Sequence, residues 1–465
     1  PVAAEKLLLS GYVVLFFMSF RYLLRALTPY ADYFSCFAGT VVLNLFFFMG
    51  FWNFLYSVCL VLFTLGYYAR RQGRWTPRSL AVLLFAGLVI YMAHALSWAM
   101  CVLAVAVMGL PHTISAVPRG RARPLFPLPA AVRRAMLQYA ASVCCLLPPG
   151  AFILMYLVRS QKNSGLIADH LPLRERLYPL YSLSFLHTIS DSDLTLAKAV
   201  AATLFLTFLF VAGTVFWRRR YSGGSTAILL LSLVCSAAII AGPDRVGSGS
   251  YIHTRVAFYA WLFFVVWLAA ALPLWPRPAL NVVSALFVCL AVFAFAIRLP
   301  ALSKWNERLS AFPVIGQHIR PGSTVLQLNL ERSKGVDPRL HGVGLLSAKA
   351  IVDICNYEAS TDHFSTKFRP EVSPFPALGT IEQLVSVLPV FDIARYERET
   401  RGRVDYLLFV GGAVSGGKSV RGLEAEQYPN QIAAYAFVAS AEGGNLRLYQ
   451  RVPARRYEGA EVREE

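Results

Sequence analysis

Charged residues are scarce in this sequence. They make up 15% of its 465 residues, against roughly 25% in ordinary globular chains, whereas hydrophobic residues make up 56%. A soluble protein could not bury so much apolar surface, which excludes an ordinary globular enzyme. The composition therefore predicts an integral membrane domain, and the length leaves room for one further domain.

Acidic residues are especially rare. The chain has 26 Asp and Glu against 44 Lys and Arg, and Asp32 is the only acid between Glu5 and Asp169. On a soluble body the net charge of +18 would suggest a nucleic acid partner. Here much of the excess lies in short segments between apolar runs, as in cytoplasmic loops, so we expect it to set orientation and expect no nucleic acid. These segments hold Arg70, Arg71, Arg74 and Arg78, then Arg119, Arg121, Arg123, Arg133 and Arg134, then Arg218, Arg219 and Arg220.

Cysteine forms no framework, although the chain has eight. Seven lie in apolar runs, where cysteine acts as a small hydrophobic residue, and Cys355 stands alone in the C-terminal part. No pair has the spacing of metal ligands with histidine partners. We therefore predict no metal site and no bound cofactor.

Eight apolar runs are candidates for membrane-spanning helices, since one crossing needs about 20 apolar residues. The run Leu80–Leu110 is too long for one helix, at about 47 Å, and basic segments flank both of its ends, so we expect it to turn near His94 and return. The other runs are Leu7–Leu27, Phe51–Tyr68, Leu137–Val158, Leu196–Trp217, Thr226–Ala241, Val256–Leu274 and Leu280–Ile297.

The distribution of basic residues predicts how these runs cross the membrane. Over residues 1–300 it gives a polytopic α-helical membrane domain of about nine spans, with the N-terminus inside. Arg159–Asp193, Pro243–Arg255 and everything after Arg298 then lie outside. The uncharged stretch Tyr33–Ala69 leaves two possibilities open. Its first half is either a helix that dips in from the outer face or a tenth span, which would place the N-terminus outside.

After Leu299 the periodicity changes to that of a small α/β domain. Residues 301–465 combine short strand patterns with one amphipathic helix pattern, at Ile381–Val390. Because the preceding run ends outside, we expect this domain to be extracytoplasmic. The predicted strands are Gly322–Leu328, Val404–Val410, Ala434–Ser440 and Leu446–Val452.

One loop of this domain matches the pattern of a nucleotide phosphate loop. Gly412–Ser419 reads G-A-V-S-G-G-K-S and follows a predicted strand. However, no clear helix begins at Lys418, and Pro429 follows soon after. We interpret this segment as a flexible surface loop and expect no ATP.

The segment from Gly242 to Arg255 is the strongest candidate for a binding site. It brings Asp244, Arg245, His253 and Arg255 together between two apolar runs. Arg255 heads the second run, where its guanidinium could bind a lipid phosphate through two parallel hydrogen bonds. The alternative is a solvated loop whose arginines contact headgroups without specificity.

Four further residues carry ionisable side chains within or beside the apolar runs. Arg21 and Arg25 share one helix face near the end of the first run, where they either contact substrate or extend to the interface. His94 has no nearby carboxylate or second histidine in the sequence, which favours packing over catalysis. Asp32 is expected to be a loop residue.

Several short stretches resemble bacterial membrane glycosyltransferases of the GT-C superfamily. Asn44–Leu55 resembles the G-F-x-N-F helix start of those enzymes, and Gly249–Arg255 is similar to their late outer loop. His94 falls where they often place a histidine at the outer end of a span. Asn356–His363 resembles a segment in the C-terminal outer domain of some members.

This resemblance implies an enzyme of the bacterial inner (plasma) membrane and cell envelope. It would take a polyprenyl-phosphate-linked sugar as donor on the extracytoplasmic face, in contact with membrane lipids and without a metal or nucleotide. The resemblance implies Arg255 as a lipid-phosphate contact and His94 as its neighbour. The family's catalytic acid lies in the first outer loop, which Asp32 does not match. We therefore expect that loop to precede Pro1, and no catalytic residue is assigned.

Two other functions use the same arginines. A transporter or flippase for a lipid-linked or anionic substrate should show repeated halves or paired broken helices, and Pro148-Pro149 is the only obvious break in the sequence. A non-catalytic membrane scaffold would instead bind a partner through its outer domain.

Overall fold

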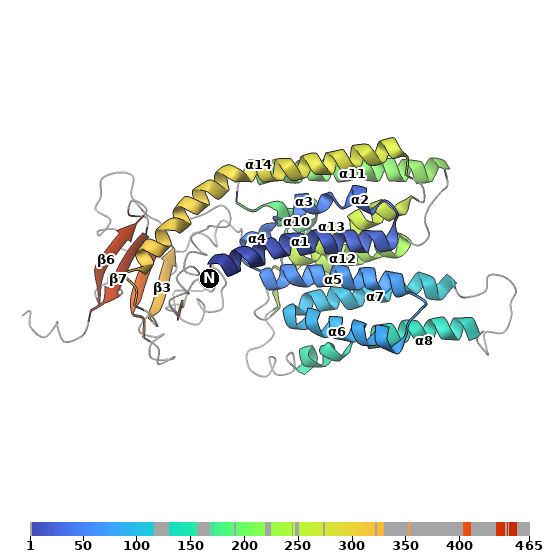
Figure 1. Ribbon diagram of the computed structural model, residues 1–465, viewed down its shortest axis with the longest axis horizontal. Helices are drawn as coiled ribbons and strands as arrows, with labels where there is room; N and C mark the ends of the chain where they lie inside the picture. The colour runs from blue at the N-terminus through green and yellow to red at the C-terminus, as the bar shows by residue number, and fades with distance from the viewer. Residues whose placement is uncertain are drawn as a thin grey trace, which may run out of the picture. The chain divides into compact units, whose positions relative to one another are not determined.

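The computed structural model divides the chain into two compact units, Pro1–Arg298 and Leu299–Glu465 (Figure 1). We call the first the helical unit and the second the C-terminal unit. The structure describes residues 2–115, 130–155, 168–169, 171–189, 192–218, 225–243, 245–246, 251–272, 275–320, 323–329, 352–353, 403–410, 434–441, 444 and 446–452.

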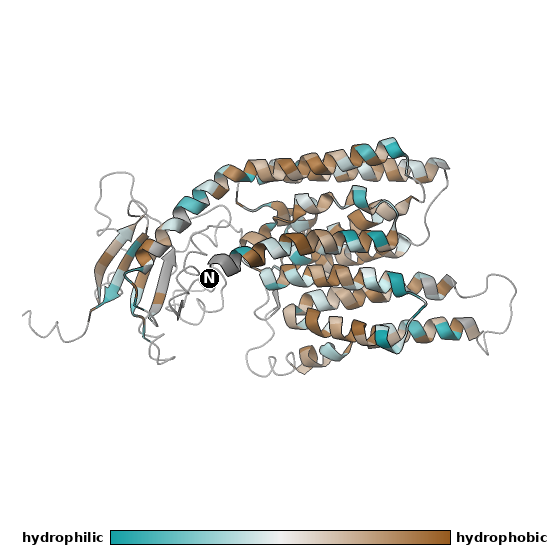
Figure 2. Cartoon of the chain, in the orientation of Figure 1, coloured by the Kyte–Doolittle hydropathy of each residue, from teal (hydrophilic) through white to brown (hydrophobic). Residues whose placement is uncertain are grey.

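Within the described residues, five helices are long and apolar enough to cross a membrane. This agrees with the predicted class of helical membrane protein, and Figure 2 shows the middles of these helices as mainly hydrophobic. The five are α1 (Val2–Leu27), α5 (Trp52–Arg71), α11 (Asp193–Arg218), α13 (Ile252–Ala271) and α14 (Arg277–Gly316).

Shorter apolar helices fill the rest of the helical unit. The long run divides into α6 (Pro77–Ala93) and α7 (Ala95–Ser115), with His94 in extended conformation between them, so the predicted turn is confirmed. α12 (Thr226–Ala241) has the predicted bounds. The predicted run Leu137–Val158 is interrupted before Pro148 and does not form one continuous helix. It is a pair, Val132–Cys144 and Pro148–Met155, bent by 42°, because a proline cannot donate to the preceding turn.

Helices α1 and α5 run in the same direction, which settles the course of the uncharged stretch. Near their starts Tyr56 donates a hydrogen bond to the Leu8 carbonyl (2.6 Å), and near their ends the Arg70 guanidinium lies 4.3 Å from the Tyr22 ring centre. The chain must therefore return between them. Residues 31–48, which we call the returning segment, do so beside α1 (Figure 1).

The returning segment consists of three short helices, α2 (Ala31–Phe34), α3 (Phe37–Val41) and α4 (Leu45–Phe48). A side chain at Gly39 would come within 2.9 Å of the Ala291 Cβ, so glycine permits close packing on α14. At the α3–α4 break the buried Asn44 accepts from the Phe47 amide and donates to the Val41 carbonyl. Backbone groups freed by the break thus find a partner inside the protein.

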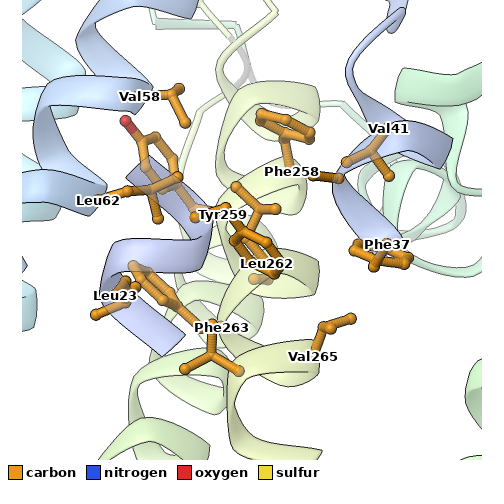
Figure 3. Close-up of a cluster of buried hydrophobic side chains, with 14 of the residues drawn as sticks. Leu23, Phe37, Val41, Val58, Leu62, Phe258, Tyr259, Leu262, Phe263 and Val265 are labelled. Atoms are coloured by element: carbon orange, nitrogen blue, oxygen red, sulfur yellow. The ribbon is translucent and has the colours of Figure 1, made fainter. Parts of the chain in front are cut away.

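Helix α13 forms the centre of the helical unit. Its sequence is apolar on all sides, and most of its side chains are buried. Figure 3 shows Phe258 facing Phe37 and Val41 of the returning segment, whereas Tyr259 faces Val58 and Leu62 of α5. α13 is therefore enclosed by the returning segment on one side and by α5 on the other.

The C-terminal unit contains a mixed sheet whose described strands have the order β4-β3-β5-β7-β6. β3 pairs in parallel with β4 and β5, whereas β7 pairs antiparallel with β5 and β6. Four strands lie where strands were predicted, and β4 was not predicted. The helix at 381–390, the loop at 412–419 and the segment at 356–363 lie outside the described residues. The strands are β3 (Thr324–Asn329), β4 (Val352–Asp353), β5 (Tyr406–Val410), β6 (Tyr435–Ala441) and β7 (Leu446–Arg451).

Candidate functional site

A buried cation lies at the end of the helical unit where α13 begins, which we call the Arg255 end. Arg255, in the first turn of α13, is 7% exposed. Its guanidinium carbon lies 4.6 Å, 5.4 Å and 5.9 Å from the ring centres of Phe51, Phe54 and Phe46. Its Nη1 lies 3.3 Å from Nε2 of His94. The sequence-predicted Arg255 and His94 therefore meet, although 161 positions separate them.

The local backbone explains why Arg255 occupies this place. Tyr251 precedes α13 in the left-handed conformation (φ 58°), and its carbonyl accepts the amide of Arg255 (3.0 Å). The Tyr251 ring also contacts that of Phe51. The sharp entry into α13 thus places the arginine beside the first amides of a helix, where anions are favoured.

The contact with Arg255 fixes the protonation of His94. A guanidinium only donates hydrogen bonds, so Nε2 of His94 accepts, and the neutral imidazole carries its proton on Nδ1. Burial, and then the charge of Arg255, lower the pKa of His94 to about 4. The histidine is therefore neutral at pH 7. Its Nδ1 is buried and has no hydrogen-bond partner among the described residues.

The aromatic rings make a buried cation tolerable at this position. Phe46, Phe51 and Phe54 present ring faces within the range of cation–π attraction, which partly replaces the lost hydration of the guanidinium. The rings and the neutral imidazole both stabilise the cation. Such an arginine is chemically suited to bind phosphate oxygens.

The remaining residues of the predicted segment have different positions. His253 is buried, and its Nε2 donates to the Gly242 carbonyl (3.0 Å), which ties the start of α13 to the end of α12. Arg245 lies in the short strand β2 (Arg245–Val246), paired with β1 (Ala168–Asp169). Asp244 and the side chain of Arg245 lie outside the described residues.

Arg21 and Arg25 do not join this site. The Thr28 hydroxyl donates to the Ala269 carbonyl (3.2 Å), so α1 ends beside the end of α13, about 21 Å along that helix from Arg255. We call this the Arg25 end. There Arg21 and Arg25 bind the two carboxylate oxygens of Asp32 (2.6 Å and 3.3 Å). Asp32 is therefore an ion-pair partner rather than a plain loop residue.

A second ion pair at the Arg255 end was not predicted. Asp193, the first residue of α11, binds Arg298 of α14 (2.8 Å), and both side chains are at most 1% exposed. In the sequence both residues stand at the borders of apolar runs, with nothing nearby to mark them as a pair. The available signal was the position itself, because an ionisable residue at membrane depth indicates a function or a partner.

The described acids do not supply an evident general base. In the helical unit the structure describes the side chains of Asp32, Glu175 and Asp193. Asp32 lies at the Arg25 end, and both oxygens of Asp193 accept hydrogen bonds. Glu175 is half-buried in the first turn of α10 (Leu173–Tyr181). Within the described residues no group of His, Cys, Asp or Glu could hold a metal ion.

No protein-family model and no curated protein matches the chain. The best-supported site is the Arg255 end, where a buried cation, a neutral histidine and three aromatic rings from distant segments converge.

Proposed function

We propose that this chain is a glycosyltransferase-like membrane protein that uses a polyprenyl-phosphate-linked sugar on the extracytoplasmic face. Over the described residues, the helices support ten crossings rather than nine. They are α1, the returning segment, α5, α6, α7, the bent pair, α11, α12, α13 and α14.

The direction of these crossings follows from their basic ends. Arg70 and Arg71 end α5, and Arg78 begins α6, so their shared end is the cytoplasmic one by the positive-inside rule. Figure 2 shows hydrophilic residues near this end of α1, α5 and α6. The Arg255 end is then extracytoplasmic, and so is the start of the C-terminal unit after Arg298.

The observation that carries the proposal is the pairing of Arg255 with neutral His94 among aromatic rings. Sugar transfer breaks the bond between the anomeric carbon and a phosphate oxygen, which keeps the electron pair. A positioned guanidinium stabilises the charge that develops on this oxygen. A base must also take the proton of the acceptor hydroxyl, and no residue is assigned to that step.

The test is Arg255→Ala in the intact protein, reconstituted in liposomes that contain a polyprenyl-phosphate sugar. We expect loss of transfer and at least a tenfold weaker affinity for polyprenyl phosphate, with normal membrane insertion. Arg255→Lys should recover only part of the affinity, because an ammonium group cannot bind two phosphate oxygens in parallel as the planar guanidinium does. Arg25→Ala is the matched control and should bind as the wild type does. Full activity of Arg255→Ala would remove the proposal.

A transporter or flippase is the second candidate, and a specific observation favours it. The structure shows two interrupted crossings, the returning segment and the bent pair Val132–Cys144 with Pro148–Met155. Discontinuous helices often form substrate sites in transporters. The same liposomes separate the functions: a transferase releases polyprenyl phosphate, whereas a flippase moves the intact lipid between leaflets. A scaffold would do neither.

A further inference from the structure

We infer that Arg298 is a positioning residue for the Arg255 site, which it shapes without contacting the bound phosphate. This inference rests on the proposed function, since it concerns the affinity of that site for a lipid phosphate. Arg298 lies on α14, and its side chain is fully buried.

The guanidinium of Arg298 joins three separate segments. Its Nε donates to Oδ1 of Asp193 (2.8 Å), its Nη1 to the Leu43 carbonyl (2.6 Å) and its Nη2 to the Leu186 carbonyl (2.8 Å). Leu43 belongs to the returning segment, and Leu186 ends the short helix η1 (Ser184–Leu186). One side chain therefore fixes α11, the returning segment and η1 relative to α14.

The Leu43 carbonyl connects Arg298 to the aromatic rings around Arg255. Leu43 precedes Asn44, whose side chain caps α4. Phe46 of α4 faces the Arg255 guanidinium and contacts Phe54, with ring centres 4.8 Å apart. A displacement of Leu43 would therefore be passed to the rings that stabilise the cation.

The Leu186 carbonyl connects Arg298 to α13 from another side. Leu186 follows Phe185, whose ring lies 5.2 Å from that of Phe258, one turn after Arg255. Phe258 also contacts Phe46 and Phe54. Arg298 thus holds the returning segment and η1 in place. Both of these segments pack against α13 close to Arg255.

Asp193 keeps the guanidinium in this orientation. Its second oxygen accepts from the Thr188 amide (2.8 Å), the Thr188 hydroxyl (2.7 Å) and the Ile189 amide (3.0 Å). A buried ion pair often adds little net stability over apolar side chains of similar volume. The planar guanidinium of Arg298 instead donates hydrogen bonds in three fixed directions and so positions three segments. The ammonium group of a lysine cannot reproduce this geometry.

The test is a double-mutant cycle on the full chain in nanodiscs, with polyprenyl phosphate as the probe. We expect Arg298→Lys to insert and fold, since it keeps the charge beside Asp193, but to raise the Kd about tenfold. In an Arg255→Ala background the same substitution should change the Kd no further, because the positioned group is gone. Asp32→Asn is the control, and its Kd should be unchanged.

Two results would overturn the inference: an unchanged Kd in Arg298→Lys, or equal effects in both backgrounds, which would show a general loss of structure. If Arg298→Lys does not fold, Asp193→Glu decides by the same cycle, since it keeps the carboxylate and its charge beside Arg298 but shifts the guanidinium. The proposed function fails separately, if Arg255→Ala alone binds polyprenyl phosphate as the wild type does.

Discussion

The two ends of the helical unit both contain an ion pair of aspartate with arginine, but the two pairs differ in their exposure to solvent. At the Arg255 end, Asp193 and Arg298 form an ion pair that is at most 1% exposed. At the Arg25 end, Asp32 binds Arg21 and Arg25 with side chains that are 47% to 58% exposed. The residue types are the same, but water solvates one set and is excluded from the other.

This difference explains what each set of charges can do. Exposed arginines cost little, so many can gather at one end and set the orientation in the membrane. Buried charges persist only where their surroundings compensate them, and the partners of Asp193 and Arg298 tie distant segments together. Charges at the Arg255 end therefore fix distant segments relative to one another, whereas those at the Arg25 end join α1 to the adjacent α2.

The comparison predicts its largest effect at Asp193. Asp193→Ala should lower the free energy of unfolding by about 3–5 kcal/mol, because it leaves the Arg298 charge buried without its carboxylate. Denaturation of the purified protein in detergent would measure this difference. A loss below 1 kcal/mol would contradict the distinction between the two ends.

Sequence could predict most of the helices because their signal is local. Thr226–Ala241 became α12 without change, and basic flanks located the turn at His94. The returning segment could not be decided, since Tyr33–Ala69 contains no charge to mark a loop. Its packing depends on Gly39, whose neighbour Ala291 lies on α14, and Asn44 holds the break between α3 and α4.

The candidate site was predictable only in part. Arg255 could be selected because it begins an apolar helix after a glycine-rich turn. His94 looked isolated because its partner lies 161 positions away. The pair Asp193 and Arg298 could not be recognised for the same reason, since 105 positions separate two residues that each looked like the border of an apolar run. Pairings of this kind depend on how the helices pack.

A pH titration would sharpen the comparison, because His94 belongs to the buried end. Its folded-state pKa of about 4 lies below the ordinary value of 6.5, so between these values the unfolded state binds more protons. Stability should be fully present above pH 6.5 and decline towards pH 4, by about 3 kcal/mol in total. Thermal unfolding from pH 7 to pH 4 measures this decline.

His94→Gln is the matched variant for that titration. Its amide can accept from Arg255 and does not titrate, so its stability should fall less over the same range. Equal slopes for the variant and the wild type would show that His94 does not contribute to the decline.

The smallest effect is expected at the exposed end. Asp32→Ala removes a carboxylate that binds two arginines, yet water already solvates all three side chains. We expect a change of at most about 1 kcal/mol in the free energy of unfolding, which should shrink further in high salt. Denaturation at low and high salt, beside Asp193→Ala, gives the measurement. A loss as large as that of Asp193→Ala, unaffected by salt, would mean that the Arg25 end also depends on its ion pairs for structure, and that burial does not separate the two ends.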